Sequence, residues 1–302
     1  MSTLAFKRLN QAYSKAKCSP FDYYSKIIIM SDCHRGVGNW GDNFAHNQNI
    51  YFAALSSYYE DGYTYIELGD GDELWENRDY DTIIDTHSHV FWLLSKFHQE
   101  NRLYMLYGNH DIVKRNTSFI EKTCSTHNNP CDKNHITLFE DIRFYEGLIL
   151  HNEKNNTNIF LTHGHQGDTL NDTYWKLARF LVRYLWRPLE LIGFKDPTSA
   201  YKNSSKRNKV ERNLINWVKK YNQMMIVGHT HRPSFPEKDG PLYFNDGSCV
   251  HPICITGIEI YKNTISLIKW SVLVDYNQSL YVGKTILEGP LALDYFINYK
   301  SD

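Results

Sequence analysis

The sequence lacks a long hydrophobic run, an excess of charge of either sign and any closely paired cysteines. No stretch of about 18 apolar residues occurs, so we expect no helix that spans a bilayer. Residues 1–17 contain no uninterrupted apolar segment, so we expect no signal peptide and a cytoplasmic protein. The formal net charge of −1 at pH 7 gives no overall basic character, which argues against a nucleic-acid partner.

The six cysteines contain no C-x-x-C pair, so we expect no disulfide framework. One local cluster, formed by Cys124, His127, Cys131 and His135, could in principle close a tetrahedral zinc site. Its intervals match no zinc-finger or zinc-ribbon pattern, and residues 123–134 are rich in Asn, Pro and Lys. We therefore interpret this segment as a polar loop.

What the sequence does contain is a series of short apolar runs separated by amphipathic segments. Its 302 residues could form one large α/β domain or two small ones, and we predict a single domain over residues 1–302. Strands that alternate with helices predict a βαβ layout. The predicted elements are a short N-terminal helix, helices at 43–61 and 83–99, a hairpin at 143–163 with its turn at 152–157, and strands at 242–244, 253–261 and 264–274.

Five of the apolar runs have strand length and lead directly into carboxylate, imidazole or amide side chains. The runs are residues 27–30, 63–68, 103–107, 158–162 and 224–227; the side chains after them are Asp32, His34, Asp70, Glu73, Asn109, His110, His163, His229 and His231. In α/β sheets, ligands bind beyond the carboxyl ends of strands. Carboxylate and imidazole together suit Mn, Fe, Zn or Co. The pattern therefore predicts a metal site, with Gly228 giving the backbone freedom to turn before the last two histidines.

At these junctions the chain resembles the calcineurin-like metallophosphoesterase superfamily. The matching motifs, in the expected order, are Asp32-x-His34, Gly69-Asp70-x-x-Glu73, Gly108-Asn109-His110-Asp111, His163 and Gly228-His229-x-His231. The resemblance covers residues 27–231 and implies an αββα four-layer sandwich with two divalent metal ions, Mn, Fe or Zn. Tyr243 to Ser248 also looks like the strand and turn that follow the last motif in many members.

The resemblance also assigns roles. It implies that Asp32, His34 and His231 hold one metal, that Asn109, His163 and His229 hold the other, and that Asp70 is shared by both. A hydroxide that bridges the metals would then be the nucleophile.

Four further residues lie close to the implied ligands in the sequence. His110 would protonate the leaving oxygen or stabilise the phosphoryl oxygens, and Glu73 matches the position that holds this histidine, with a plain structural acid as the alternative. Arg35 could contact phosphate or form a salt bridge. His165 is expected beside the ligands.

Residues 171–222 differ in character from the rest, because they carry twelve Lys or Arg and four Asp or Glu, a net of +8. An apolar helical stripe runs through the segment, with Arg179 and Arg183 on its other side, and Pro188 is expected to kink or end the helix. One interpretation is a core helix with a solvated basic face. The other is a cap beside the active site that binds an amphiphilic anion or an anionic membrane surface, with Arg179 and Arg183 as substrate contacts.

A helical insertion at the same place holds acyl chains in bacterial UDP-2,3-diacylglucosamine pyrophosphohydrolases, which residues 228–233 also resemble; that branch usually has Arg at the position of His110. The sequence thus predicts a dinuclear metal-dependent phosphoesterase for a phosphorylated small-molecule or lipid-like substrate. The alternatives are a protein Ser/Thr phosphatase or nuclease, and a non-catalytic binding module on the same fold. No Arg-Gly pair follows residues 69–73, which argues against the protein phosphatase. The basic surface is confined to residues 171–222, which argues against the nuclease. All seven implied ligands are present, which argues against the non-catalytic module.

Overall fold

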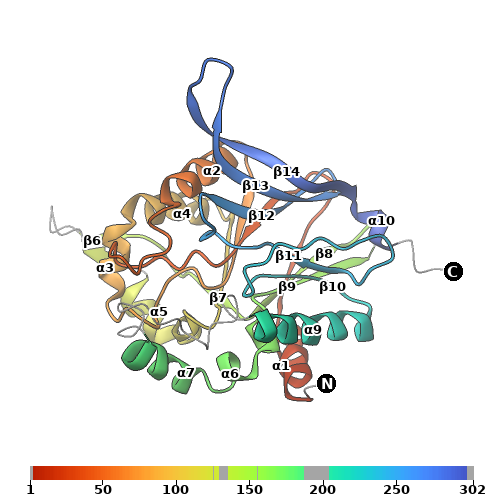
Figure 1. Ribbon diagram of the computed structural model, residues 1–302, viewed down its shortest axis with the longest axis horizontal. Helices are drawn as coiled ribbons and strands as arrows, with labels where there is room; N and C mark the ends of the chain where they lie inside the picture. The colour runs from red at the N-terminus through yellow and green to blue at the C-terminus, as the bar shows by residue number, and fades with distance from the viewer. Residues whose placement is uncertain (1–2, 125, 129–134, 155, 187–203, 298–302) are drawn as a thin grey trace.

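Two β-sheets lie face to face at the centre of the protein (Figure 1). The computed structural model describes residues 3–124, 126–128, 135–154, 156–186 and 204–297. The seven-stranded sheet has the order β14 (Leu280–Ala292), β13 (Thr264–Val274), β12 (Cys254–Tyr261), β2 (Lys26–Met30), β3 (Thr64–Leu68), β4 (Leu103–Leu106), β7 (Phe144–Tyr145). The five-stranded sheet has the order β1 (Lys17–Pro20), β8 (Gly147–Asn152), β9 (Thr157–Thr162), β10 (Met224–Val227), β11 (Tyr243–Asn245).

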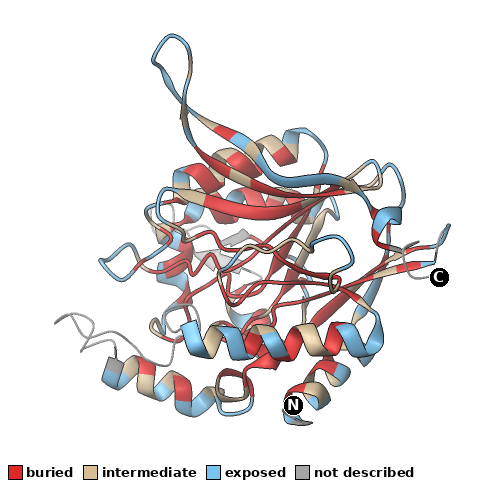
Figure 2. Ribbon diagram, turned by 45° about the vertical axis from the view of Figure 1, so that its right-hand side comes forward, coloured by how far each residue is buried: buried red, intermediate tan, exposed pale blue. Residues whose placement is uncertain are grey.

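Strand β2 shows why its run of apolar residues is buried on both faces. Ile27 and Ile29 belong to the hydrophobic core between the two sheets, whereas Ile28 and Met30 belong to a second core on the outer face of the larger sheet. Successive side chains of a strand point to opposite faces, so a strand covered on both sides reads as a continuous apolar run. Figure 2 shows the buried residues concentrated in the sheets and on the inward faces of the helices.

Helices cover the outer face of each sheet and complete four layers (Figure 1). The larger sheet is covered by α2 (Gln48–Glu60) and α4 (Ser88–Gln99), whose apolar residues fill the second core together with those of α3 (Tyr80–Thr86) and α5 (Thr117–Thr123). The smaller sheet is covered by α1 (Thr3–Ser14) and α9 (Ser204–Tyr221), where the rings of Tyr13 and Trp217 lie 5.7 Å apart. The predicted αββα sandwich is confirmed.

Several predicted boundaries need correction. The helix expected at 43–61 begins only at Gln48, and the helix expected at 83–99 is two helices that meet at His87. His87 is fully buried and its Nε2 lies 2.9 Å from Asp42 Oδ2, a partner that helical spacing could not reveal. The predicted hairpin is confirmed, because β8 and β9 pair antiparallel up to Asn152 and Thr157. Strand β14 was not predicted; with β13 it forms a hairpin that projects from the body.

The segment with the cysteine and histidine cluster is not a simple loop. Strands β5 (Thr126–Asn128) and β6 (His135–Thr137) pair antiparallel there. Cys124 is fully buried in the core on the outer face of the larger sheet, which removes it from a surface zinc site, and Cys131 lies outside the described residues.

The described part of the basic segment is helical. It consists of α6 (Thr169–Asp172), α7 (Trp175–Leu181), the π-helical turn η3 (Val182–Trp186) and α9. The kink predicted at Pro188 lies outside the described residues. Among the helices that the structure describes, none has the length and apolar character needed to cross a membrane.

Candidate metal centre

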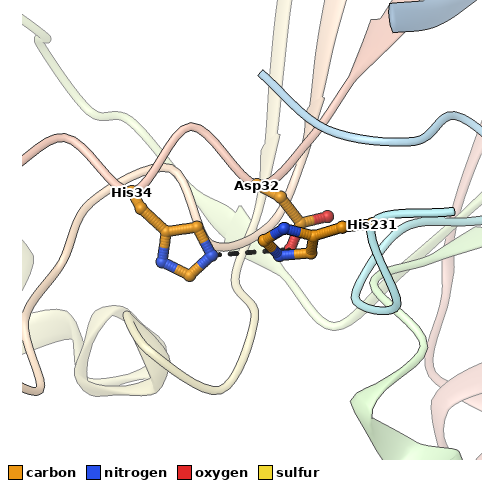
Figure 3. Close-up of side chains that lie close together, drawn as sticks. All are labelled: Asp32, His34 and His231. Carbon is orange, nitrogen blue, oxygen red and sulfur yellow. Dashed lines mark ion pairs between the residues drawn. The ribbon is translucent and has the colours of Figure 1, made fainter. Parts of the chain in front are cut away.

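The topology brings five strand ends to one place. Strands β2, β3 and β4 are mutually parallel in the larger sheet, and β9 and β10 are parallel in the smaller sheet, so the carboxyl ends within each set share one edge. The residues that follow these ends are the predicted ligands. Asp32, His34 and His231 form one group, in which Asp32 Oδ1 lies 3.0 Å from His231 Nε2 and 3.7 Å from His34 Nε2. Figure 3 shows both imidazoles directed at this carboxylate.

Asp70 lies between this group and a second one. Its Oδ2 is 3.1 Å from His163 Nε2 and 3.8 Å from His34 Nε2. Asp70 therefore lies near one histidine that follows a strand of the smaller sheet and one that follows a strand of the larger sheet. Asp70, His163 and His229 offer ligand atoms that all lie within 4.8 Å of one another. This is the position expected of a carboxylate that is shared by two ions.

The donor atoms fit two divalent cations. Asp32 Oδ1, Asn109 Oδ1 and the Nε2 atoms of His34, His163 and His229 are buried and, apart from close contacts with other candidate ligands, have no hydrogen-bond partner. Leaving a buried acceptor unpaired costs about 1–3 kcal/mol, so five such atoms aimed at one place need a common partner. Oxygen and imidazole nitrogen donors together suit Mn, Fe or Zn.

Hydrogen bonds outside the centre fix which ring nitrogen faces inward. Glu73 Oε2 lies 2.9 Å from His34 Nδ1, and the Leu68 carbonyl lies 2.9 Å from His163 Nδ1. Carboxylate and carbonyl oxygens can only accept, so each Nδ1–H donates and Nε2 is the ring atom that can bind a metal once it carries no proton. Such outer partners orient metal-binding histidines.

The ligand residues share an unusual backbone conformation. Asp32, His34, Asp70, His229 and His231 all have positive φ, between 49° and 66°. Non-glycine residues seldom adopt this left-handed region, and such strain concentrates at functional sites. The histidines after β10 thus make the turn themselves. Gly228 has another role, because a Cβ there would lie 2.1 Å from Ser31 Oγ and 2.6 Å from Asp32 Oδ2.

The charges of the centre keep its carboxylates ionised. Burial raises the pKa of Asp70, but the His163 and His110 imidazoles outweigh it and hold that pKa well below its ordinary value. Conversely, burial lowers the pKa of His163, whereas Asp70 and Asp32 raise it, to about 9. Metal binding must therefore displace a proton from this histidine.

His110 lies at the edge of the centre, with its side chain 22% exposed. Its Nδ1 is 2.9 Å from Glu73 Oε1, and its backbone N–H donates to Asp70 Oδ1 at 2.8 Å. Burial lowers the pKa of His110, but Glu73 and Asp70 raise it by more, which favours the imidazolium. Glu73 thus contacts two histidines, His34 and His110, where the sequence motif suggested one.

Arg35 is not a phosphate contact in this structure. It is fully buried, its Nη atoms donate to Glu67 at 2.7 and 2.8 Å, and its Nε donates to Asp72 Oδ1 at 2.6 Å. The salt-bridge alternative is therefore the one observed. Lys114 joins the network through Asp72 and Asp111, and no pattern in the sequence indicated that these residues pair with one another.

The two arginines predicted to bind substrate differ. Arg183 Nε donates to the Trp75 carbonyl at 2.7 Å and its Nη2 donates to the Leu74 carbonyl at 2.9 Å, so its guanidinium binds the protein backbone. Arg179 lies over the Trp175 ring at 4.9 Å, together with Arg115 at 5.5 Å, a residue that the sequence analysis missed.

Two further polar residues border the centre. His165 is fully buried with its ring centroid 5.5 Å from that of His163, beside the ligands as expected. Asp168, which the sequence analysis missed, places Oδ2 3.6 Å from His229 Nε2 and caps helix α6 with Oδ1. An Asp directly before a helical run is typical of a helix cap. No sequence pattern therefore indicated that this residue also lies beside His229.

Comparisons with known proteins bear on the family alone. No curated protein matches the chain. One similar solved structure is that of Vps29 from Chaetomium thermophilum, with 10% identity and a TM-score of 0.40 over 88% of this chain and 97% of that chain. The family model described as calcineurin-like phosphoesterase matches residues 25–233, more than half of the chain. The protein therefore belongs to the calcineurin-like phosphoesterase family.

Proposed function

We propose that the protein is a metal-dependent phosphoesterase that hydrolyses a phosphate ester or pyrophosphate bond of an amphiphilic substrate. The observation that carries the proposal is the convergence of buried, unpaired donor atoms around Asp70, with His110 at the exposed edge. A binding module could keep the fold, but it would have no need of a partly exposed imidazole beside the shared carboxylate.

Two divalent ions, when bound here, supply Lewis acidity and a water of lowered pKa. Asp32, His34 and His231 would hold one ion, Asn109, His163 and His229 the other, and Asp70 both. Asp70 also accepts the His110 backbone N–H, so the shared carboxylate and the histidine are placed relative to each other.

His110 would act on the leaving group. Its Nδ1–H is held by Glu73, which leaves Nε2 as the ring atom that can give a proton to the departing oxygen. The imidazolium that the Glu73 carboxylate favours by raising the pKa of His110 is the form needed for this transfer. After the transfer, the neutral ring takes up a proton from solvent before the next turnover.

The surface of α7 and η3 supports an amphiphilic substrate. Five large apolar side chains in this stretch are between 45% and 57% exposed: Tyr174, Leu177, Phe180, Tyr184 and Leu185. Arg115, Lys176 and Arg179 gather around Trp175 beside them. Cations suit a phosphate head group, and the apolar side chains suit an apolar tail or the surface of an anionic membrane.

A nucleotide-sugar lipid with a pyrophosphate linkage is one substrate of this class, in keeping with the resemblance to UDP-2,3-diacylglucosamine pyrophosphohydrolases. The test is a hydrolysis screen with Mn-, Fe- and Zn-loaded protein against phosphomonoesters, phosphodiesters, cyclic nucleotides and pyrophosphate lipids, with Asp70→Asn protein as the matched control. We expect turnover that needs metal and is highest for amphiphilic substrates. Folded, metal-loaded protein that hydrolyses none of them would favour the binding module.

A further inference from the structure

The indole of Trp75 is stacked on the imidazole of His110. The ring centroids are 4.3 Å apart and the ring planes are inclined by 20°. Trp75 is 2% exposed, although it follows a motif of polar residues. The hydrogen bond to Glu73 holds one atom of the imidazole, which still permits the ring to tilt about that bond. The stacked indole covers one face of the ring and fixes its plane, so the two contacts together set the direction of Nε2.

The chain around Trp75 is tied to the same carboxylate. The backbone N–H groups of Trp75 and Glu76 donate to Glu73 Oε1 at 3.2 and 3.3 Å, and Asn77 Nδ2 donates to the Glu73 carbonyl at 2.9 Å. The turn from Glu73 to Asn77 therefore holds the carboxylate and the indole as one unit.

This unit is held from the outside by the helical segment. Ala178 and Val182 pack against Trp75 in a small hydrophobic cluster of their own. Arg183, more than 100 residues away in the sequence, donates to the carbonyls of Leu74 and Trp75. A planar guanidinium can make two such bonds in a fixed geometry, whereas a Lys ammonium is a point donor on a flexible stem.

We propose that Trp75 is a positioning residue for His110 and that Arg183 and the inner face of α7 lock Trp75 in place. The helical segment thus has two faces with separate tasks: its outer face meets solvent, and its inner face sets the orientation of the proton donor. This inference rests on the proposed role of His110 in hydrolysis.

The first test needs neither metal nor substrate. In metal-free protein labelled with ¹³C at histidine Cε1, the His110 resonance, assigned by His110→Gln, should be shifted upfield by the indole ring current. We expect that shift to disappear in Trp75→Leu, to persist in part in Trp75→Phe and to shrink in Arg183→Ala. Arg212→Ala is the matched control, because Arg212 is an exposed arginine of α9 and its loss changes the charge equally.

An equal His110 shift in wild type and Trp75→Leu overturns the stacking, and an unchanged shift in Arg183→Ala overturns the lock. If Trp75→Leu does not fold, Trp75→Phe and Arg183→Ala decide the same two points. If the metal-loaded wild-type protein hydrolyses no substrate, the proposed function fails. The His110 shift in the metal-free protein still tests whether Trp75 positions His110.

The second test is a double-mutant cycle on turnover. Trp75→Leu should lower kcat for alkyl phosphates by about tenfold or more, with KM unchanged, because misplacing a catalytic group by about 1 Å can cost about 10²-fold. In the His110→Ala background the same substitution should have no further effect, since the residue it positions is gone. An equal loss in both backgrounds would show that Trp75 only supports the fold.

Discussion

The strand-end centre and the helical segment differ in how their polar and apolar groups are arranged. In the centre, the carboxylates and most of the imidazoles are buried, His110 and His231 are partly buried, and these side chains are held by named partners or by a strained backbone. In the segment, large apolar side chains are half exposed, and Lys176 and Arg179 lie over the ring of Trp175. A buried arrangement tolerates one geometry, whereas an exposed one tolerates many ligands. A single substitution in the centre should therefore cause a large loss of turnover, whereas substitutions in the segment should change substrate preference by small steps.

Removal of metal should have the largest effect. Two sets of ligands that share Asp70 predict two transition ions per chain, measured by elemental analysis after loading with Mn or Fe. Chelation should abolish hydrolysis, and re-addition should restore it. A stoichiometry that stays at zero in folded protein would contradict the whole account of the centre.

Arg35→Leu should lower the free energy of unfolding by about 3–5 kcal/mol, because it removes the guanidinium that pairs with the buried Glu67 and leaves the buried Asp72 with Lys114 alone. The exposed Arg212→Ala serves as the control and should change stability by about 0.5 kcal/mol or less. Denaturant unfolding at constant pH measures both. Equal, small effects would mean that the network is not buried in solution.

Asp70→Asn should reduce turnover by about 10²-fold or more, because an amide cannot neutralise two neighbouring cations. Steady-state rates should be compared at measured metal occupancy. Near-normal turnover with both ions bound would show that another carboxylate is shared.

His110→Ala should reduce turnover of alkyl phosphates by about 10²-fold, the lower end for general acid assistance. The loss should be smaller for p-nitrophenyl phosphate, whose leaving group needs little protonation. Parallel measurements on the two substrates decide between roles, because equal losses would favour stabilisation of the phosphoryl oxygens.

Changes on the outer face of the segment should have the smallest effect. Leu177→Ser with Phe180→Ser should raise KM for an amphiphilic phosphate by about tenfold, in line with the loss of apolar contacts. Lys176→Ala with Arg179→Ala should raise it less, and the difference from wild type should shrink with added salt. Turnover of small esters should stay unchanged. An equal effect on small esters would assign this face to the scaffold.

Much of the fold and of the centre follows from local patterns. The five strands and the hairpin were predictable because apolar runs of strand length end at polar residues. The pattern also predicted a metal site at these strand ends, whereas the assignment of individual ligands came from the family resemblance. The interaction partners of the arginines were not predictable from the sequence. Arg35, Arg179 and Arg183 carry the same group, yet one lies in a buried ion-pair network, one on an aromatic ring and one on backbone carbonyls.

The sequence by itself determined which residues end the strands, and thereby the family and the chemistry of the donor set. The tertiary structure decided how those residues are held. The left-handed backbone at Asp32 and His229, the two histidines on Glu73 and the indole on His110 all depend on contacts between distant segments. The physical reason is one of range. Strand formation and burial are encoded in neighbouring residues, whereas the partner of a buried charge or ring is fixed only when the sheets and helices pack together.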